Sequence, residues 1–174
     1  GKTAEVKVSQ AKLDGPVAQR GISSAEDLTA FAKAVNEGSS LTPFMVDGVV
    51  VLLNDIDASS IKDWTPIGTS SNPFAGNFDG KGRTIKNINW TIDASKYADA
   101  GIFGYTQGAS ILGLNVGDAG NKITVKGNAA GLNAGVIVGN AVGGSLTGCT
   151  NYADLVYEGN HSGAAVCVAG LCGR

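Results

Sequence analysis

The chain has 174 residues, which is enough for one domain with a substantial core. It carries 13 basic and 15 acidic residues, a balance that excludes the basic stripe a nucleic-acid-binding surface needs. Glycine, at 26 residues, is the outlier in the composition and indicates many tight turns and close backbone approaches. No apolar run reaches the length of a membrane span.

Residues 1–21 are predicted to form an N-terminal arm or linker. Within this segment, residues 3–9 (TAEVKVS) alternate apolar and polar side chains as a strand does. Residues 13–16 (LDGP) have the composition of a turn.

An amphipathic helix is predicted at about residues 24–37. Ser23 or Ser24 can cap its first turn, and Gly38 can end it in the left-handed conformation. Apolar residues recur at the spacing of one helical face, at Leu28, Phe31, Ala32 and Val35. A single such helix before a β array is expected to cap the open end of the array.

The chain after Gly48 has the pattern of β-structure. Residues 49–55 (VVVLLND) form a continuous apolar run, typical of a strand buried in a parallel arrangement. Residues 84–92 (TIKNINWTI) alternate, with Ile85, Ile88, Trp90 and Ile92 as candidates for the inside once one residue is skipped. Between these runs lies a turn whose structural residues are Asp79, Gly80 and Gly82.

The second half of the chain repeats itself at intervals of 32–35 residues. Short apolar segments separated by Gly and Asn at such a period predict stacked β units that bury their apolar faces against one another. We therefore expect parallel coils over about residues 46–170, within a domain of residues 22–174. The matched segments are 100–104 with 134–139, 110–116 with 145–151, and 122–127 with 154–159, and a last copy begins at 164–170.

The alternative of a β-sandwich fits less well. Sandwich strands should alternate apolar and polar residues, and the runs VVVLL and VIV do not. Parallel strands joined by crossovers also predict right-handed winding. The glycines that recur in the repeats, expected to be structural, are Gly101, Gly104, Gly135 and Gly139.

Three segments together carry a family likeness: residues 54–88, which contain WTPIG and FAGNFDGKGRTI, AGIFGY at 100–105, and AGVIVG at 134–139. They resemble the GLUG-repeat modules of bacterial cell-surface and secreted proteins. The resemblance implies a right-handed parallel β-helix, a surface or secreted location, and flanking domains in the full-length protein. The last copy departs from the pattern, because AAVCVAG (164–170) places Ala164 or Ala165 where the family has glycine.

Candidate catalytic and metal-binding residues are few, and we expect no catalytic residue, metal or cofactor. His161 is the only histidine and lies in a polar turn. Asp55 and Asp57 could bind calcium or act as an acid–base pair, but Asp at a strand end commonly bonds its own backbone. The three cysteines lack zinc-knuckle spacing. A Cys167–Cys172 disulfide is the alternative to free thiols if the strand turns back between them.

Aromatic side chains with polar groups are the candidate binding residues, because exposed aromatic faces stack on sugars or anchor proteins. The candidates are Trp64, Trp90, Tyr97 and Tyr152. Trp64 has the alternative of packing against the turn of its motif.

The favoured function is therefore a non-catalytic, adhesin-like binding or spacer module of a larger exported bacterial protein. Its expected partner is a host glycan or surface protein. The alternative is a carbohydrate-active β-helix enzyme, either a polysaccharide lyase or a glycoside hydrolase. Such an enzyme would need its scattered acidic residues to meet in one groove.

Overall fold

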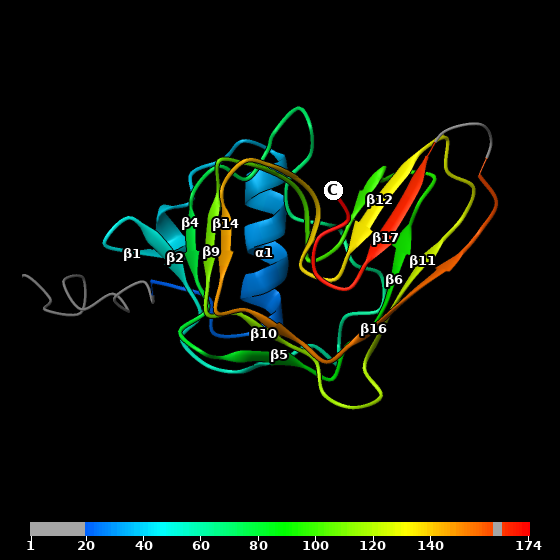
Figure 1. Cartoon of the computed structure of the whole chain (residues 1–174). Coiled ribbons are helices and arrows are strands. Elements are labelled where there is room, and N and C mark those ends of the chain that lie inside the picture. The colour runs from blue at the N-terminus through cyan, green and yellow to red at the C-terminus, as the bar shows by residue number, and fades with distance from the viewer. Residues whose placement is uncertain (1–19, 162–164) are drawn as a thin grey trace, which may run out of the picture.

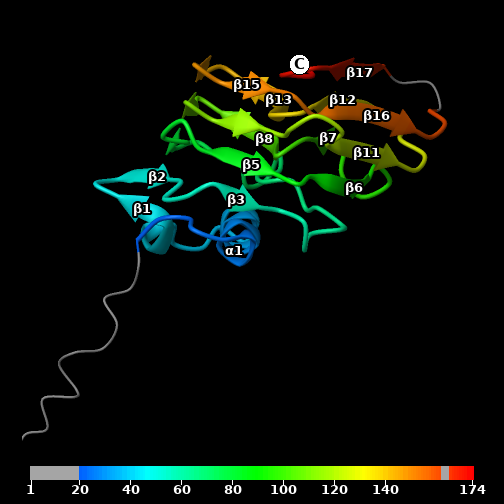
Figure 2. The same cartoon turned by 90° about the horizontal axis from the view of Figure 1, so that it is seen from below.

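A computed structural model describes residues 20–161 and 165–174. The chain forms a β-solenoid of about three turns, in which each turn of the chain lies on the one before it (Figures 1 and 2). The strands pair in parallel, apart from one antiparallel pair at the start. The expected strand TAEVKVS lies outside the described residues.

The helix α1 spans Ala25–Asn36, as the sequence predicts. The hydroxyl of Ser24 accepts a hydrogen bond from the backbone N–H of Asp27, and Gly38 ends the helix with a φ of +67°. The predicted apolar face is buried, and its Phe31 ring lies 5.7 Å from Phe74 and 6.1 Å from Phe78. A short 3₁₀ helix, Thr42–Phe44, leads from the helix region into the first strand.

Four layers of short strands follow, seen edge-on in Figure 2. The first layer holds β1 (Met45–Val46), β2 (Val49–Val51) and β3 (Ile56–Asp57). The second holds β4 (Asn77–Asp79), β5 (Thr84–Lys86), β6 (Asn89–Asp93), β7 (Asp99–Ala100) and β8 (Phe103–Gln107). The third holds β9 (Ser110–Leu112), β10 (Asn115–Val116), β11 (Lys122–Lys126), β12 (Leu132–Gly135) and β13 (Val138–Val142). The fourth holds β14 (Ser145–Thr147), β15 (Thr150–Asn151), β16 (Asp154–Glu158) and β17 (Val166–Ala169).

The register of the strands confirms the sequence repeats. Ser110 pairs with Ser145, the offset of 35 found in the sequence, and Lys122 pairs with Asp154, the offset of 32. The length of the sequence repeat is therefore the number of residues in one turn of the solenoid. Corresponding strands form columns, such as β2–β4–β9–β14 and β6–β11–β16.

The extra residue in AGVIVG is absorbed between β12 and β13. Ala134 pairs with Ala100, an offset of 34, whereas Val138 pairs with Phe103, an offset of 35. One additional residue is therefore inserted at the corner, where Val136 and Ile137 are both fully buried.

The expected place of the last copy is wrong. The position that corresponds to Gly135 is taken by Ala169, not by Ala164 or Ala165. The expectation aligned AAVCVAG with AGVIVG, which is too early in the chain. The segment between β16 and β17 is longer than the segment between β11 and β12, because the offset between paired residues rises from 32 at β16 to 34 at β17. β17 then pairs with β12 over Val166–Ala169.

The core runs along the inside of the stack. All four candidates in TIKNINWTI are buried, which confirms the inward side of this segment. The skipped residue corresponds to a corner at Asn87, which adopts a φ of +59° between β5 and β6. From VVVLL, Val50 and Leu52 belong to this core, and Leu52 bridges to Ile22, whereas Val49 is half-buried.

Two kinds of glycine serve the coils. Gly82 has a φ of +69° in the turn after β4 and faces open space, so its role is conformational. Gly101 has an ordinary φ, but a Cβ atom there would overlap the carbonyl oxygen of Gly135 and lie 2.8 Å from that of Phe103. Gly104, Gly135 and Gly139 are enclosed by backbone atoms in the same way.

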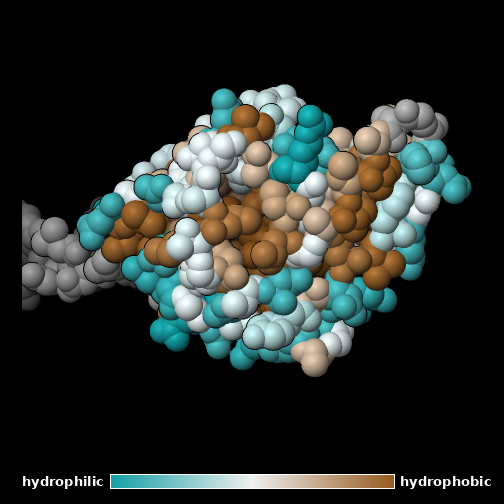
Figure 3. All heavy atoms as spheres, viewed as in Figure 1, coloured by the Kyte–Doolittle hydropathy of each residue, from teal (hydrophilic) through white to brown (hydrophobic). Residues whose placement is uncertain are grey.

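The fourth layer leaves its inner side chains partly uncovered. Figure 3 looks onto this end of the stack and shows apolar residues gathered across its middle. Val168 is 46% exposed although Ala134, its partner in the layer below, is fully buried. In the same way Leu155 is half-buried above the fully buried Ile123. We refer to this surface, formed by the outer side of β14–β17, as the open end.

The close approach at Gly101 predicts a measurable loss of stability. Gly101→Ala should reduce the free energy of unfolding by more than about 1 kcal/mol, because the new methyl group must displace backbone of the neighbouring layer. Gly170→Ala is the matched control, since a Cβ at Gly170 meets nothing within 4 Å. Equal denaturant midpoints for the two variants and the parent would contradict the packing role of Gly101.

Candidate functional site

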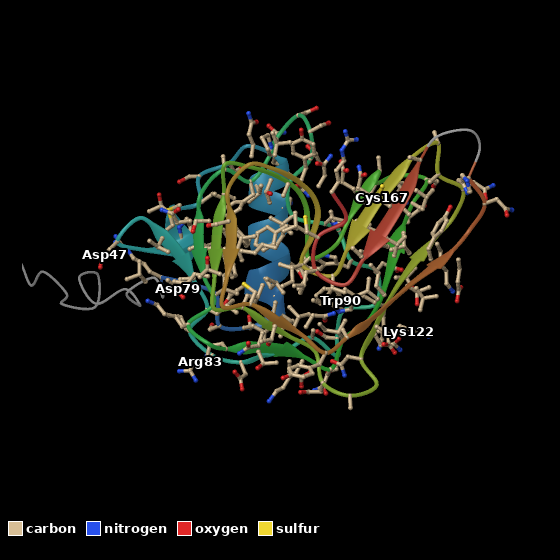
Figure 4. All side chains as sticks on the ribbon, in the orientation of Figure 1. Asp47, Asp79, Arg83, Trp90, Lys122 and Cys167 are labelled. Atoms are coloured by element: carbon tan, nitrogen blue, oxygen red, sulfur yellow. The ribbon has the colours of Figure 1, made fainter. Side chains whose placement is uncertain are left out.

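Trp64 and Trp90 are not exposed, so they are wrong as binding candidates. They are 3% and 1% exposed, and their rings stack with centroids 4.6 Å apart. The Trp64 indole N–H donates to the carbonyl oxygens of Gly101 and Ile102, at 3.0 and 3.2 Å. The pair therefore joins the first two layers from the inside, where Figure 4 shows Trp90.

Tyr152 and Tyr97 differ in their surroundings. Tyr152 is 68% exposed and follows β15 in the fourth layer. Tyr97 is half-buried and packs against the core, and its hydroxyl lies 3.4 Å from that of Thr65. Tyr97 also lines two adjoining hollows, of about 340 and 170 Å³.

We call these two hollows and the tyrosine between them the Tyr97 groove. Its walls come from two layers: the loop of residues 63–70 in the first, and the turn of residues 93–99 in the second. The lining is rich in groups that form hydrogen bonds, which are Asp63, Thr65, Thr69, Ser70, Thr91, Asp93, Lys96 and Asp99. An aromatic ring among carboxylates, hydroxyls and an amine is suited to a polyhydroxylated ligand.

The turn that carries Tyr97 is held by Asp93. This carboxylate accepts hydrogen bonds from both the backbone N–H and the hydroxyl of Ser95, and it pairs with the Lys96 ammonium at 3.5 Å. These contacts, led by the Ser95 hydroxyl, lower the pKa of Asp93 below its usual range. The groove therefore keeps this negative charge through neutral and mildly acidic pH. Any stability the bonds add is lost only as the pH falls through the lowered pKa.

The opposite wall is held by the end of α1. The Asn36 side chain donates to the Pro66 carbonyl at 3.0 Å and accepts from the Gly68 N–H at 2.7 Å. Asn72 in turn donates to the Asn36 carbonyl at 2.8 Å. A preformed wall of this kind lowers the entropy lost when a ligand binds.

A further hollow, of about 500 Å³, lies beside the β1–β2 hairpin on the side of Figure 4 where Asp47, Asp79 and Arg83 are labelled. Its floor is apolar, and the chain enters the fold beside it at Gly21, which lies against Leu53. Asp79 fills its predicted turn role, since its carboxylate accepts from the Lys81 N–H at 2.7 Å and pairs with the Lys81 ammonium at 2.8 Å. The Lys81 contacts lower the pKa of Asp79.

The remaining candidates have structural surroundings. Asp55 accepts from the Thr84 N–H at 3.0 Å, and Asp57 from the Ser59 N–H at 3.0 Å and the Asn87 amide at 3.0 Å. His161 is exposed and pairs by its backbone with Ala129. Cys149, Cys167 and Cys172 are free thiols, so Cys167 and Cys172 are not bridged.

Within residues 20–161 and 165–174, no three His, Cys, Asp or Glu side chains gather closely enough to hold a metal ion. The described part of the chain also contains no helix with the length and apolar character that crossing a membrane requires. Comparisons with protein-family models, with curated proteins and with solved structures found no match for this chain.

The buried tryptophan pair predicts a large effect on stability. Trp64→Ala should lower the free energy of unfolding by about 3–5 kcal/mol, because it empties a buried aromatic position and removes the indole donor from the Gly101 carbonyl. Chemical denaturation followed by circular dichroism measures this loss. Tyr152→Ala, the exposed control, should change stability by no more than about 0.5 kcal/mol; a Trp64 variant with the same small effect would contradict the structural role.

Proposed function

We propose that this chain is a non-catalytic, adhesin-like binding module of a larger exported bacterial protein, and that it binds a host glycan in the Tyr97 groove. The proposal places the module at the cell surface or in the secreted fraction, with flanking domains. It also assigns the chain to the GLUG-repeat type and its coils to right-handed winding. The residues that resemble the GLUG pattern support this assignment, together with a solenoid whose period matches the repeats.

The observation that carries the glycan proposal is the position of Tyr97 between two polar hollows. One face of a pyranose ring is apolar enough to stack on an aromatic side chain, whereas its edge carries hydroxyls. The Asp93 carboxylate and the Thr65 hydroxyl can accept from such hydroxyls, and the Lys96 ammonium can donate to them. The two adjoining hollows provide room for neighbouring sugar units on both sides of the ring.

Loss of the Tyr97 ring should weaken this binding strongly. On a glycan array, we expect the parent to bind a restricted set of glycans and Tyr97→Ala to lose at least about tenfold in affinity, as removal of a central aromatic contact does. Tyr152→Ala is the matched control, because it removes an exposed tyrosine at a different part of the stack.

An array without any bound glycan, or equal loss in both tyrosine variants, would contradict the groove as the binding site. Release of new reducing ends from a bound glycan would instead favour the carbohydrate-active enzyme. Titration calorimetry with the best glycan then separates affinity from array avidity.

We also propose that α1 caps the first layer. Figure 2 shows α1 against the end of the stack where β2 and β3 lie, and its buried face contains Leu28, Phe31 and Val35. A helix at this place keeps water and other chains from the apolar interior of the first layer.

Removal of the helix should therefore expose this interior. We expect the chain lacking residues 22–38 to aggregate, as measured by light scattering of the purified protein. Lys33→Ala on the exposed face of the intact helix is the control and should leave the scattering unchanged. A truncated protein that is folded and monomeric would contradict the capping role.

A further inference from the structure

The open end presents backbone as well as apolar side chains. β14, β15, β16 and β17 each pair with a strand of the third layer on one side, and no described strand pairs with the other side. Their outward N–H and C=O groups can therefore accept a further strand. The longest of these edges is β16, where Leu155 and Tyr157 are half-buried above the fully buried Ile123 and Val125.

The charges of β16 restrict which strand can pair there. Asp154 and Glu158 stand at its two ends, and Glu158 continues a register column of alternating sign, Asp93–Lys126–Glu158. The Lys126 ammonium already lies 3.5 Å from the Glu158 carboxylate. Two copies of β16 paired antiparallel about Val156 would place Asp154 opposite Glu158, and like charges directly opposite each other destabilise a strand pair. A basic residue opposite Glu158 is favoured instead.

We propose that this edge takes up residues 3–7 (TAEVK) of a second copy of the chain as an additional parallel strand. In the register that pairs residue 3 with residue 154, Ala4 and Val6 cover Leu155 and Tyr157. Lys7 then lies opposite Glu158 and extends the column of alternating charge. A shift by two residues preserves the inward side but sets Glu5 against Asp154. A shift by one turns the apolar residues outward.

The place where the chain enters the fold favours a second copy over the same molecule. Gly21 and Ile22 pair with the region of the first layer, at the end of the stack opposite to β16 (Figure 2). β16 also runs toward the side of the molecule away from this entry point (Figure 1). Between residues 7 and 20 the chain spans at most about 47 Å when extended, and it would have to pass around the body of the solenoid.

Sedimentation velocity of the full chain over a wide range of concentration tests the proposal. We expect concentration-dependent dimers or longer chains. Val6→Asp should weaken the association by more than about tenfold, because it sets a charge over the open end. Lys7→Glu and Glu158→Lys should each weaken it by about fivefold, and the two together should restore it, since the pair is then reversed but matched. Glu5→Gln, which faces outward in this register, is the control without effect.

A chain that is monomeric at every concentration would overturn the proposal, including the case in which residues 3–7 dock on their own molecule. Association that persists in Val6→Asp would also overturn it. The proposal would also be overturned if the double variant Lys7→Glu, Glu158→Lys associated more weakly than either single variant.

Discussion

Backbone pairing between successive turns, in register and in parallel, is the constraint on which the rest of this structure depends. Each short strand has little apolar area, and two to five residues cannot fold alone. Stacking places Ile123 over Trp90 and Val125 over Ile92, so every inner layer is covered from both sides. The same rule leaves the fourth layer covered on one side only, and its inner residues are correspondingly exposed.

Small residues allow the layers to stack at the corners. Gly101 and Gly104 lie where the backbone of one layer contacts that of the next, and Gly135 and Gly139 repeat the arrangement one layer on. A side chain at these positions would separate the strands that must pair. The polar loops lie outside these corners, so the Tyr97 groove is formed without disturbing the stack. Residues on such loops can vary while the columns of strands beneath them stay constant.

Much of the fold could be predicted from the sequence, because the spacing of the repeats equals the strand register and the apolar positions are the buried ones. The offsets of 32 and 35 are the register of β16 and β14, and the skipped residue in TIKNINWTI is the corner at Asn87. The last copy was misplaced because the segment before β17 varies in length and only pairing determines its register. The candidate site was predicted less well. Trp90 lies in a segment of alternating apolar residues, and this pattern indicates a buried core position more strongly than an aromatic side chain indicates a ligand contact. Asn36 supports the groove wall through its hydrogen bond to Pro66, which is 30 residues away in the chain. No local sequence pattern indicates a contact over that separation.

Nuclear Overhauser effects between backbone protons of β6, β11 and β16 test the parallel in-register stack most directly. The account predicts contacts that link Thr124 to Thr91 on one side and to Val156 on the other, with cross-strand contacts spaced as in parallel sheets. Contacts that instead join sequence neighbours such as β5 and β6 as antiparallel hairpins would contradict it.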